Sequence, residues 1–207
     1  MDLVSTFKTE VFRPVVSILI PGATAISTYI YLLFLSFPNE VSGLANHATF
    51  STVVFIIVTI SCGMVLEDLG ALIESFYGWV LARKNLDYDA EWNQYLLCHF
   101  DPKPIGISYY SSILVRVKFE LSFSIAIMFS LIGIMIINQT CKDVAIFNDI
   151  YWKLIFIGAV VASYLLFEAY RGVVLLGDLR HQFLTNPVNI VTDDLTKQNS
   201  RKMLNEA

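Results

Sequence analysis

Four long apolar segments, separated by polar ones, dominate the chain. They cover residues 15–37, 51–82, 113–137 and 152–176. An α-helix needs about 20 apolar residues to cross a hydrocarbon core of roughly 30 Å, and each segment meets that length. The pattern therefore predicts an all-α integral membrane protein with four transmembrane helices.

The polar segments between these spans differ in length. Those at residues 38–50 and 138–151 are short, and the central loop at residues 83–112 is longer. Short connections make consecutive helices antiparallel neighbours. We therefore expect an up-down bundle that forms a single domain over residues 1–185, followed by a polar tail at residues 186–207.

Two further segments have the apolar spacing of a helix but are too short to span a bilayer. Residues 1–12 are expected to form an amphipathic helix on the membrane surface, with a frayed polar terminus as the alternative. Residues 89–100 predict a short amphipathic helix in the central loop, which Asp101-Pro-Lys-Pro104 ends. On that helix, four side chains would contact headgroups or a neighbouring subunit: Trp92, Tyr95, His99 and Phe100.

The distribution of lysine and arginine predicts the orientation of the spans. Lys8 and Arg13 precede the first span, and more basic residues lie in the central loop and after the last span. The first short link has no Lys or Arg, and the other has Lys142. Because positive residues collect on the cytoplasmic side, we expect a cell-membrane protein whose termini and central loop are cytoplasmic.

The N-terminal region also contains a sequence that looks like a signal-peptidase site, Pro21-Gly-Ala-Thr-Ala25. A cleaved signal peptide would end its apolar run at this site. Here the apolar run continues to Phe37, which favours a retained first span over a cleaved signal.

Composition agrees with a membrane location and argues against several other classes. The chain is 56% hydrophobic and 15% charged, with a mean hydropathy of +0.61, which is unusual for a soluble domain. A net charge of -4 gives no basic surface for direct nucleic-acid binding. The histidines and cysteines lack metal-ligand spacing, and no catalytic motif occurs, so we predict neither an enzyme nor a metal or cofactor.

Eight charged residues lie inside the predicted spans, where a charge is costly and marks a functional candidate. Estimated at about 1.5 Å per residue, all eight fall in one layer of the cytoplasmic half of the bilayer. The five acids and three bases leave two negative charges uncompensated. Two interpretations stay open: pairs that fix helix register, or groups that line a water-filled path. The residues are Glu67, Asp68, Glu74, Arg116, Lys118, Glu120, Glu168 and Arg171.

Small residues recur at three- or four-residue spacing on the second and fourth spans. Residues three or four apart share one face of a helix, and small ones let two helices approach closely. We therefore expect helix packing at Gly63, Gly70, Gly78, Gly158, Ala162 and Gly172.

These features favour a homo-oligomeric channel- or pore-like membrane protein or effector, because four helices enclose little aqueous space and a path would form between subunits. The alternative is a non-catalytic membrane anchor or sensor whose central loop and tail hold a cytoplasmic protein. In size and layout the chain is similar to small four-span subunits of prokaryotic antiviral defence systems, which implies an effector or anchor in such a complex. An intramembrane enzyme or a secondary transporter is a third interpretation, but the sequence shows neither a catalytic motif nor an internal repeat that would favour it.

Overall fold

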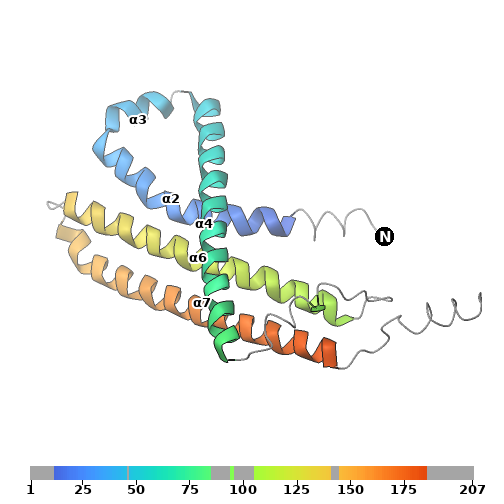
Figure 1. Ribbon diagram of the computed structural model, residues 1–207. Helices are drawn as coiled ribbons and strands as arrows, with labels where there is room; N and C mark the ends of the chain where they lie inside the picture. Colours follow the sequence, from blue (N-terminus) through green and yellow to red (C-terminus); the bar gives the residue numbers. More distant parts are fainter. Residues whose placement is uncertain (1–11, 46, 85–93, 96–104, 141–144, 186–207) are drawn as a thin grey trace, which may run out of the picture. The chain divides into compact units, whose positions relative to one another are not determined.

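The computed structural model describes residues 12–45, 47–84, 94–95, 105–140 and 145–185. Four of its helices are long and apolar enough to cross a membrane. The prediction of an all-helical chain with four such helices is therefore confirmed for the described residues, and it supports a membrane location. The helices are α2 (Phe12–Ser36), α3 (Pro38–Ala45), α4 (Ala48–Lys84), α6 (Ile105–Thr140) and α7 (Ala145–Thr185) (Figure 1).

Three of the helices are longer than the predicted spans. α4, α6 and α7 contain 37, 36 and 41 residues. At about 1.5 Å per residue they extend roughly 54–62 Å, well beyond a hydrocarbon core of about 30 Å. Much of the excess lies toward the central loop and tail: α6 begins at Ile105, directly after Pro104, and α7 continues past Leu176 to Thr185.

The predicted polar link at residues 38–50 contains an additional helix, α3. Pro38 begins it, because the fixed φ and missing N–H of proline suit the first turn, and Glu40 interacts favourably with the helix dipole there. The Phe37 amide donates to the Leu33 carbonyl over 2.9 Å, and the Val41 amide donates to the Phe37 carbonyl over 3.1 Å. The hydrogen-bond ladder therefore continues almost unbroken from α2 into α3.

Several predictions fall on parts of the chain outside the described residues. These include residues 1–11 of the surface helix and the tail at residues 186–207. Of the helix expected at residues 89–100, Gln94 and Tyr95 are described, and both are helical. The up-down order, the single domain and the orientation of the termini stay predictions.

Residue contacts divide the chain into two compact units. The first comprises Met1–Phe76 and Arg116–Tyr170, and the second comprises Tyr77–Val115 and Arg171–Ala207. Three helices, α4, α6 and α7, contribute to both units.

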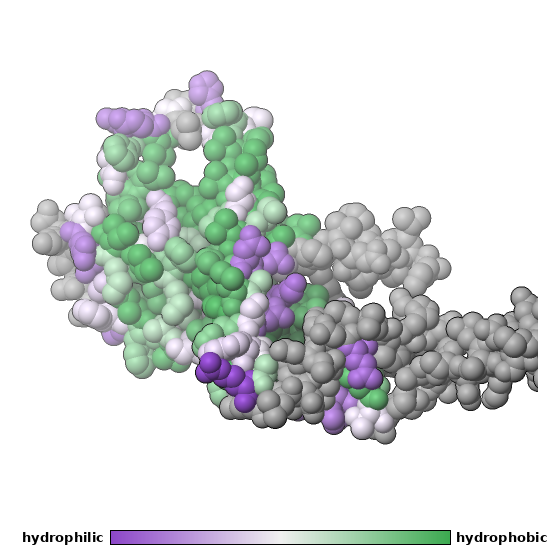
Figure 2. All heavy atoms as spheres, in the orientation of Figure 1, coloured by the Kyte–Doolittle hydropathy of each residue, from purple (hydrophilic) through white to green (hydrophobic). Residues whose placement is uncertain are grey.

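Among the described residues of the first unit, α6 supplies more buried positions than any other helix. In the most apolar stretch of α6, 44% of the residues are buried, whereas the corresponding share is 11–17% in the other three spans. Ala25, Leu66, Ile125 and Ala126 form one hydrophobic cluster, so α2, α4 and α6 share a core. Many other apolar side chains face outward (Figure 2). Such exposure suits a bilayer, where the lipid tails are as apolar as the side chains.

In the second unit, aromatic rings join part of the central loop to two helices. The ring centroid of Tyr95 lies 5.3 Å from that of Tyr110 on α6 and 6.2 Å from that of Phe183 on α7. On α4, the Arg83 guanidinium lies 3.7 Å from the centre of the Trp79 ring, a cation–π contact. Tyr95, a predicted partner contact, thus packs against aromatic rings of its own chain.

Candidate functional site: a charged layer within the spans

Arg116 joins carboxylates from two helices of the first unit. Its Nε donates to Glu120 Oε1, one turn along α6, over 2.6 Å. Its Nη2 donates to Glu168 Oε1 on α7 over 3.1 Å. The planar guanidinium presents several donors in a fixed fork, so a single arginine can serve two acceptors. The cluster carries one positive and two negative charges.

The three members of this cluster differ in exposure. The Glu120 side chain is 9% exposed and that of Glu168 is 20% exposed, whereas that of Arg116 is 61% exposed. A carboxylate removed from water is costly unless a donor or a cation compensates it. The outward-lying Arg116 compensates both carboxylates and therefore holds α6 against α7.

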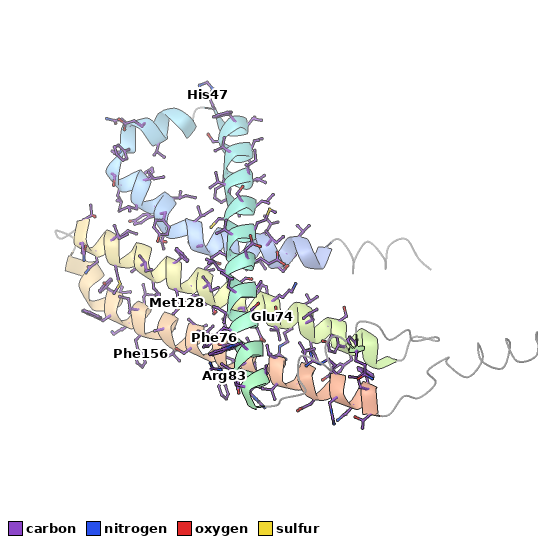
Figure 3. All side chains as sticks on the ribbon, in the orientation of Figure 1. His47, Glu74, Phe76, Arg83, Met128 and Phe156 are labelled. Carbon is purple, nitrogen blue, oxygen red and sulfur yellow. The ribbon has the colours of Figure 1, made fainter. Side chains whose placement is uncertain are left out.

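A second pair of opposite charges lies where α4 meets α6. Glu74 on α4, labelled in Figure 3, is half-buried, and Lys118 on α6 is exposed. The two charges attract each other without forming an ion pair at contact distance. Beside this pair, α4 contacts α6 at Gly70, where an added Cβ would meet Leu121 and Ser122. Glu74 follows Gly70 by four residues on α4, and Lys118 precedes Ser122 by four residues on α6. Residues four apart share a helix face, which explains why Glu74 and Lys118 lie near each other.

Glu67 and Asp68 stand apart from these pairs. Among the described residues, neither side chain forms an ion pair or a hydrogen bond. Successive helix residues diverge by about 100°, and accordingly Glu67 is half-buried whereas Asp68 is exposed. Within the part of the chain that the structure describes, these two acids therefore have no ion-pair partner.

Three of the predicted packing glycines make close contacts within the first unit. A Cβ on Gly63 would meet the Ile18 carbonyl oxygen and, at 2.7 Å, Ile18 Cγ2 of α2. One on Gly70 would lie 3.2 Å from Ser122 Oγ, and one on Gly158 would lie 2.7 Å from Leu131 Cδ2. Of the other predicted positions, Ala162 is buried, and Gly78 and Gly172 lie half-buried in the second unit. Their roles in packing stay predictions.

Sequence reasoning missed two glycines that make contacts of the same kind. A Cβ on Gly22 of α2 would meet the Thr59 carbonyl oxygen and lie 3.0 Å from the Gly63 amide nitrogen of α4. One on Gly133 of α6 would meet Thr28 of α2, whose Cβ is 2.8 Å away. The sequence gives little indication of these two contacts. Gly22 follows Pro21, and Gly133 stands alone in an apolar run, so neither belongs to a series of small residues at helical spacing.

Trp92, His99 and Phe100 lie outside the described residues. Arg171 is exposed on α7, three residues after Glu168, and belongs to the second unit. Within the described ranges, no three His, Cys, Asp or Glu side chains lie together as metal ligands would.

Comparison of the chain with protein-family models, with curated proteins and with solved structures gives no match.

Proposed function

We propose that the protein is a homo-oligomeric, channel-like membrane protein that conducts cations through a water-filled path beside α4. The observation that supports this proposal is the pair Glu67 and Asp68, which lie within an apolar helix and have no counter-charge among the described residues. Hydrocarbon does not solvate a carboxylate, so acids within spans face protein, water or cations.

The balance of charge in the layer points in the same direction. In the first unit, five carboxylates share the layer with two cations, Arg116 and Lys118, which leaves an excess of three negative charges. An acidic layer of this kind attracts cations and repels anions, as charged rings do in cation channels.

A path through one copy alone is disfavoured by the packing of the first unit. α6 occupies its centre, and α2 and α4 contact each other through backbone atoms at Gly22 and Gly63. Four helices so arranged leave little room for water, whereas symmetric association encloses a path between copies.

The proposal includes an up-down order of the helices, for which α6 and α7 offer support. Leu131 lies against Gly158, and Arg116 binds Glu168. Residue numbers thus fall along α6 as they rise along α7, as in antiparallel neighbours (Figure 1). The proposal therefore also puts both termini in the cytoplasm, which the distribution of Lys and Arg along the chain supports.

Conductance of the purified protein in planar bilayers tests the proposal. We expect cation-selective currents, and Glu67→Gln should keep the oligomer mass and reduce the preference for cations over anions, because shape is retained and charge is lost. Glu40→Gln on α3 is the matched control, since it makes the same chemical change on an exposed helix outside the four spans. A folded wild-type oligomer that conducts no ions would exclude the channel.

The second candidate is a membrane anchor for a cytoplasmic protein, which the contacts of Tyr95 favour. Because Tyr95 packs on Tyr110 and Phe183, that part of the central loop is held on the second unit, as a docking surface would be. On the resemblance in layout, the protein so held would belong to a prokaryotic antiviral defence complex. A monomer without conductance whose retention of a soluble protein is lost in Tyr95→Ala would support the anchor.

A further inference from the structure

One exposed face of α4 carries a charge among apolar side chains. Asp68 is exposed on the same face as Met64, Val65 and Leu72, which are 55%, 57% and 66% exposed. We refer to these four residues as the α4 face. Lipid tails accommodate its apolar members, but they offer no hydrogen-bond donor to Asp68.

An exposed face of α7 carries a hydroxyl among apolar side chains. Phe156, Val160, Tyr164 and Phe167 are 70%, 52%, 61% and 59% exposed, and they follow one another at intervals of four, four and three residues. We refer to them as the α7 face, from which Phe156 projects in Figure 3. Among the described residues, the Tyr164 hydroxyl has no hydrogen-bond partner.

Tyr164 also lies deeper than membrane tyrosines usually do. Tyrosines of membrane proteins concentrate at the interfaces, where the hydroxyl reaches water. Tyr164 is twelve residues along α7 from Trp152, about 18 Å inward at 1.5 Å per residue. At that depth the hydroxyl needs a partner in a protein, because hydrocarbon provides none.

The two faces are complementary in chemistry and similar in depth. An ionised carboxylate only accepts hydrogen bonds, whereas a phenol donates one, and an O–H donor to a carboxylate makes a short, strong bond. Asp68 lies about 25 Å along α4 from Ser51, so the two depths differ by little more than one helical turn. The length of the tyrosine side chain covers such a difference.

We infer that the α4 face of one copy packs against the α7 face of the next copy, with Tyr164 donating its hydroxyl hydrogen bond to Asp68. This inference rests on the homo-oligomer of the proposed function and names its interface. It assigns Asp68 to the contact between copies and leaves Glu67 to line the path. Two different faces meet, so the contact is heterologous and closes a ring when the rotation between copies allows it. The isologous alternative is worse, because two α4 faces would set one Asp68 carboxylate against another.

Cysteine cross-linking in membranes tests the pairing of the faces. Cys62, Cys98 and Cys141 are first changed to Ser, and the oligomer mass shows whether this background is intact. A chain with both Val65→Cys and Val160→Cys should form a ladder of dimers and higher species with a short thiol-reactive linker, and neither change alone should form one. Val65→Cys with Met135→Cys is the matched control, since Met135 is similarly exposed on α6 but lies outside both faces.

Two results would overturn the inference. Dimers from Val65→Cys alone would show that two α4 faces meet, and no ladder from the double variant would show that the faces contact lipid or another protein.

The hydrogen bond itself is tested by Tyr164→Phe, which removes the hydroxyl and keeps the ring. We expect the concentration at which the oligomer dissociates in detergent to rise about threefold or more, the usual range for a single hydrogen bond between membrane helices. Tyr31→Phe on α2 is the control, because Tyr31 is also exposed and lies outside both faces. Adding Asp68→Leu to Tyr164→Phe should weaken assembly less than Asp68→Leu does in the wild-type chain. Equal effects of Asp68→Leu in both backgrounds would rule out the bond.

The two proposals fail separately in these experiments. A ladder without conductance removes the channel and keeps the interface. Conductance without a ladder removes the interface and keeps the channel.

Discussion

Two helix contacts of the first unit involve opposite kinds of residue. α2 meets α4 at Gly22 and Gly63, where backbone atoms face each other and no charge takes part. α6 meets α7 through Arg116, which holds Glu120 and Glu168. One contact depends on the absence of side chains, and the other on side chains with full charges.

The difference shows what each contact demands of its surroundings. A glycine contact depends on shape, so it needs no water and suits any depth in a bilayer. An ion cluster needs donors, acceptors and polar surroundings, so it belongs where water or headgroups reach it. The exposed Arg116 side chain can adjust its position, whereas the backbone oxygen of Ile18 cannot move without its helix.

The largest effect is expected from Gly63→Ala, which adds one methyl group to the glycine contact. The new Cβ would meet the Ile18 carbonyl oxygen and lie 2.7 Å from Ile18 Cγ2, so α2 and α4 must move apart. Overpacking of this kind costs about 1–3 kcal/mol of unfolding free energy. Thermal or denaturant unfolding in detergent measures it.

Two other glycines provide matched controls for that change. Gly43 on α3 has nothing within 4 Å of its Cβ position, so Gly43→Ala should stabilise the helix by up to about 1 kcal/mol. In Gly70→Ala the new Cβ would lie 3.2 Å from Ser122 Oγ and 3.3 Å from Leu121 Cβ, so shifts of a few tenths of an ångström suffice and the loss should be smaller than for Gly63→Ala. Equal stability of Gly63→Ala and Gly43→Ala would mean that the backbones of α2 and α4 do not touch.

A smaller loss of unfolding free energy is expected from Arg116→Gln, which leaves the Glu120 and Glu168 carboxylates without their cation. Breaking a buried ion pair costs about 3–5 kcal/mol, and exposed pairs contribute about 0–1 kcal/mol. With Arg116 61% exposed and Glu120 9% exposed, we expect about 1–2 kcal/mol, between these limits. Adding Glu120→Gln should restore part of the loss, because it removes the more buried uncompensated charge. A double variant less stable than Arg116→Gln would show that charge is not the cause.

The spans and part of the charged cluster could be predicted from the sequence. Apolar length determines a span, and the prolines at 104 and 187 adjoin the helix boundaries at Ile105 and Thr185. The four-residue spacing of Arg116 and Glu120 predicts that they share a face. The depth estimated from residue spacing predicts that Glu168 lies at a similar level to Arg116 and Glu120. In the structure Glu168 accepts a hydrogen bond from Arg116.

The contacts of Gly22 and Gly133, and the helix α3, could not be predicted in the same way. Which glycine meets a neighbouring backbone depends on how two helices cross and how each is rotated, and the near-uniform hydrophobicity of a span does not determine either. Gly22 and Gly133 therefore carry no signal that separates them from glycines tolerated in any membrane helix. For α3, the 38–50 link is short and polar, and a short helix that begins at Pro38 is compatible with both properties.

The smallest effect is expected where α2 meets α6, at a contact that is neither glycine nor ion pair. The Tyr29 hydroxyl donates to the Phe129 carbonyl oxygen of α6 over 3.1 Å. That carbonyl belongs to a helix whose own hydrogen bonds remain, so Tyr29→Phe removes an additional bond without leaving a bare backbone group. Hydrogen bonds between membrane helices average about 0.6 kcal/mol, and we expect a loss of that size in unfolding free energy. Tyr31→Phe, two residues along the same helix, removes a hydroxyl from an exposed side chain and should change nothing. A loss for Tyr29→Phe as large as for Gly63→Ala would mean that polar bonds, rather than close backbone contact, hold α2 in the first unit.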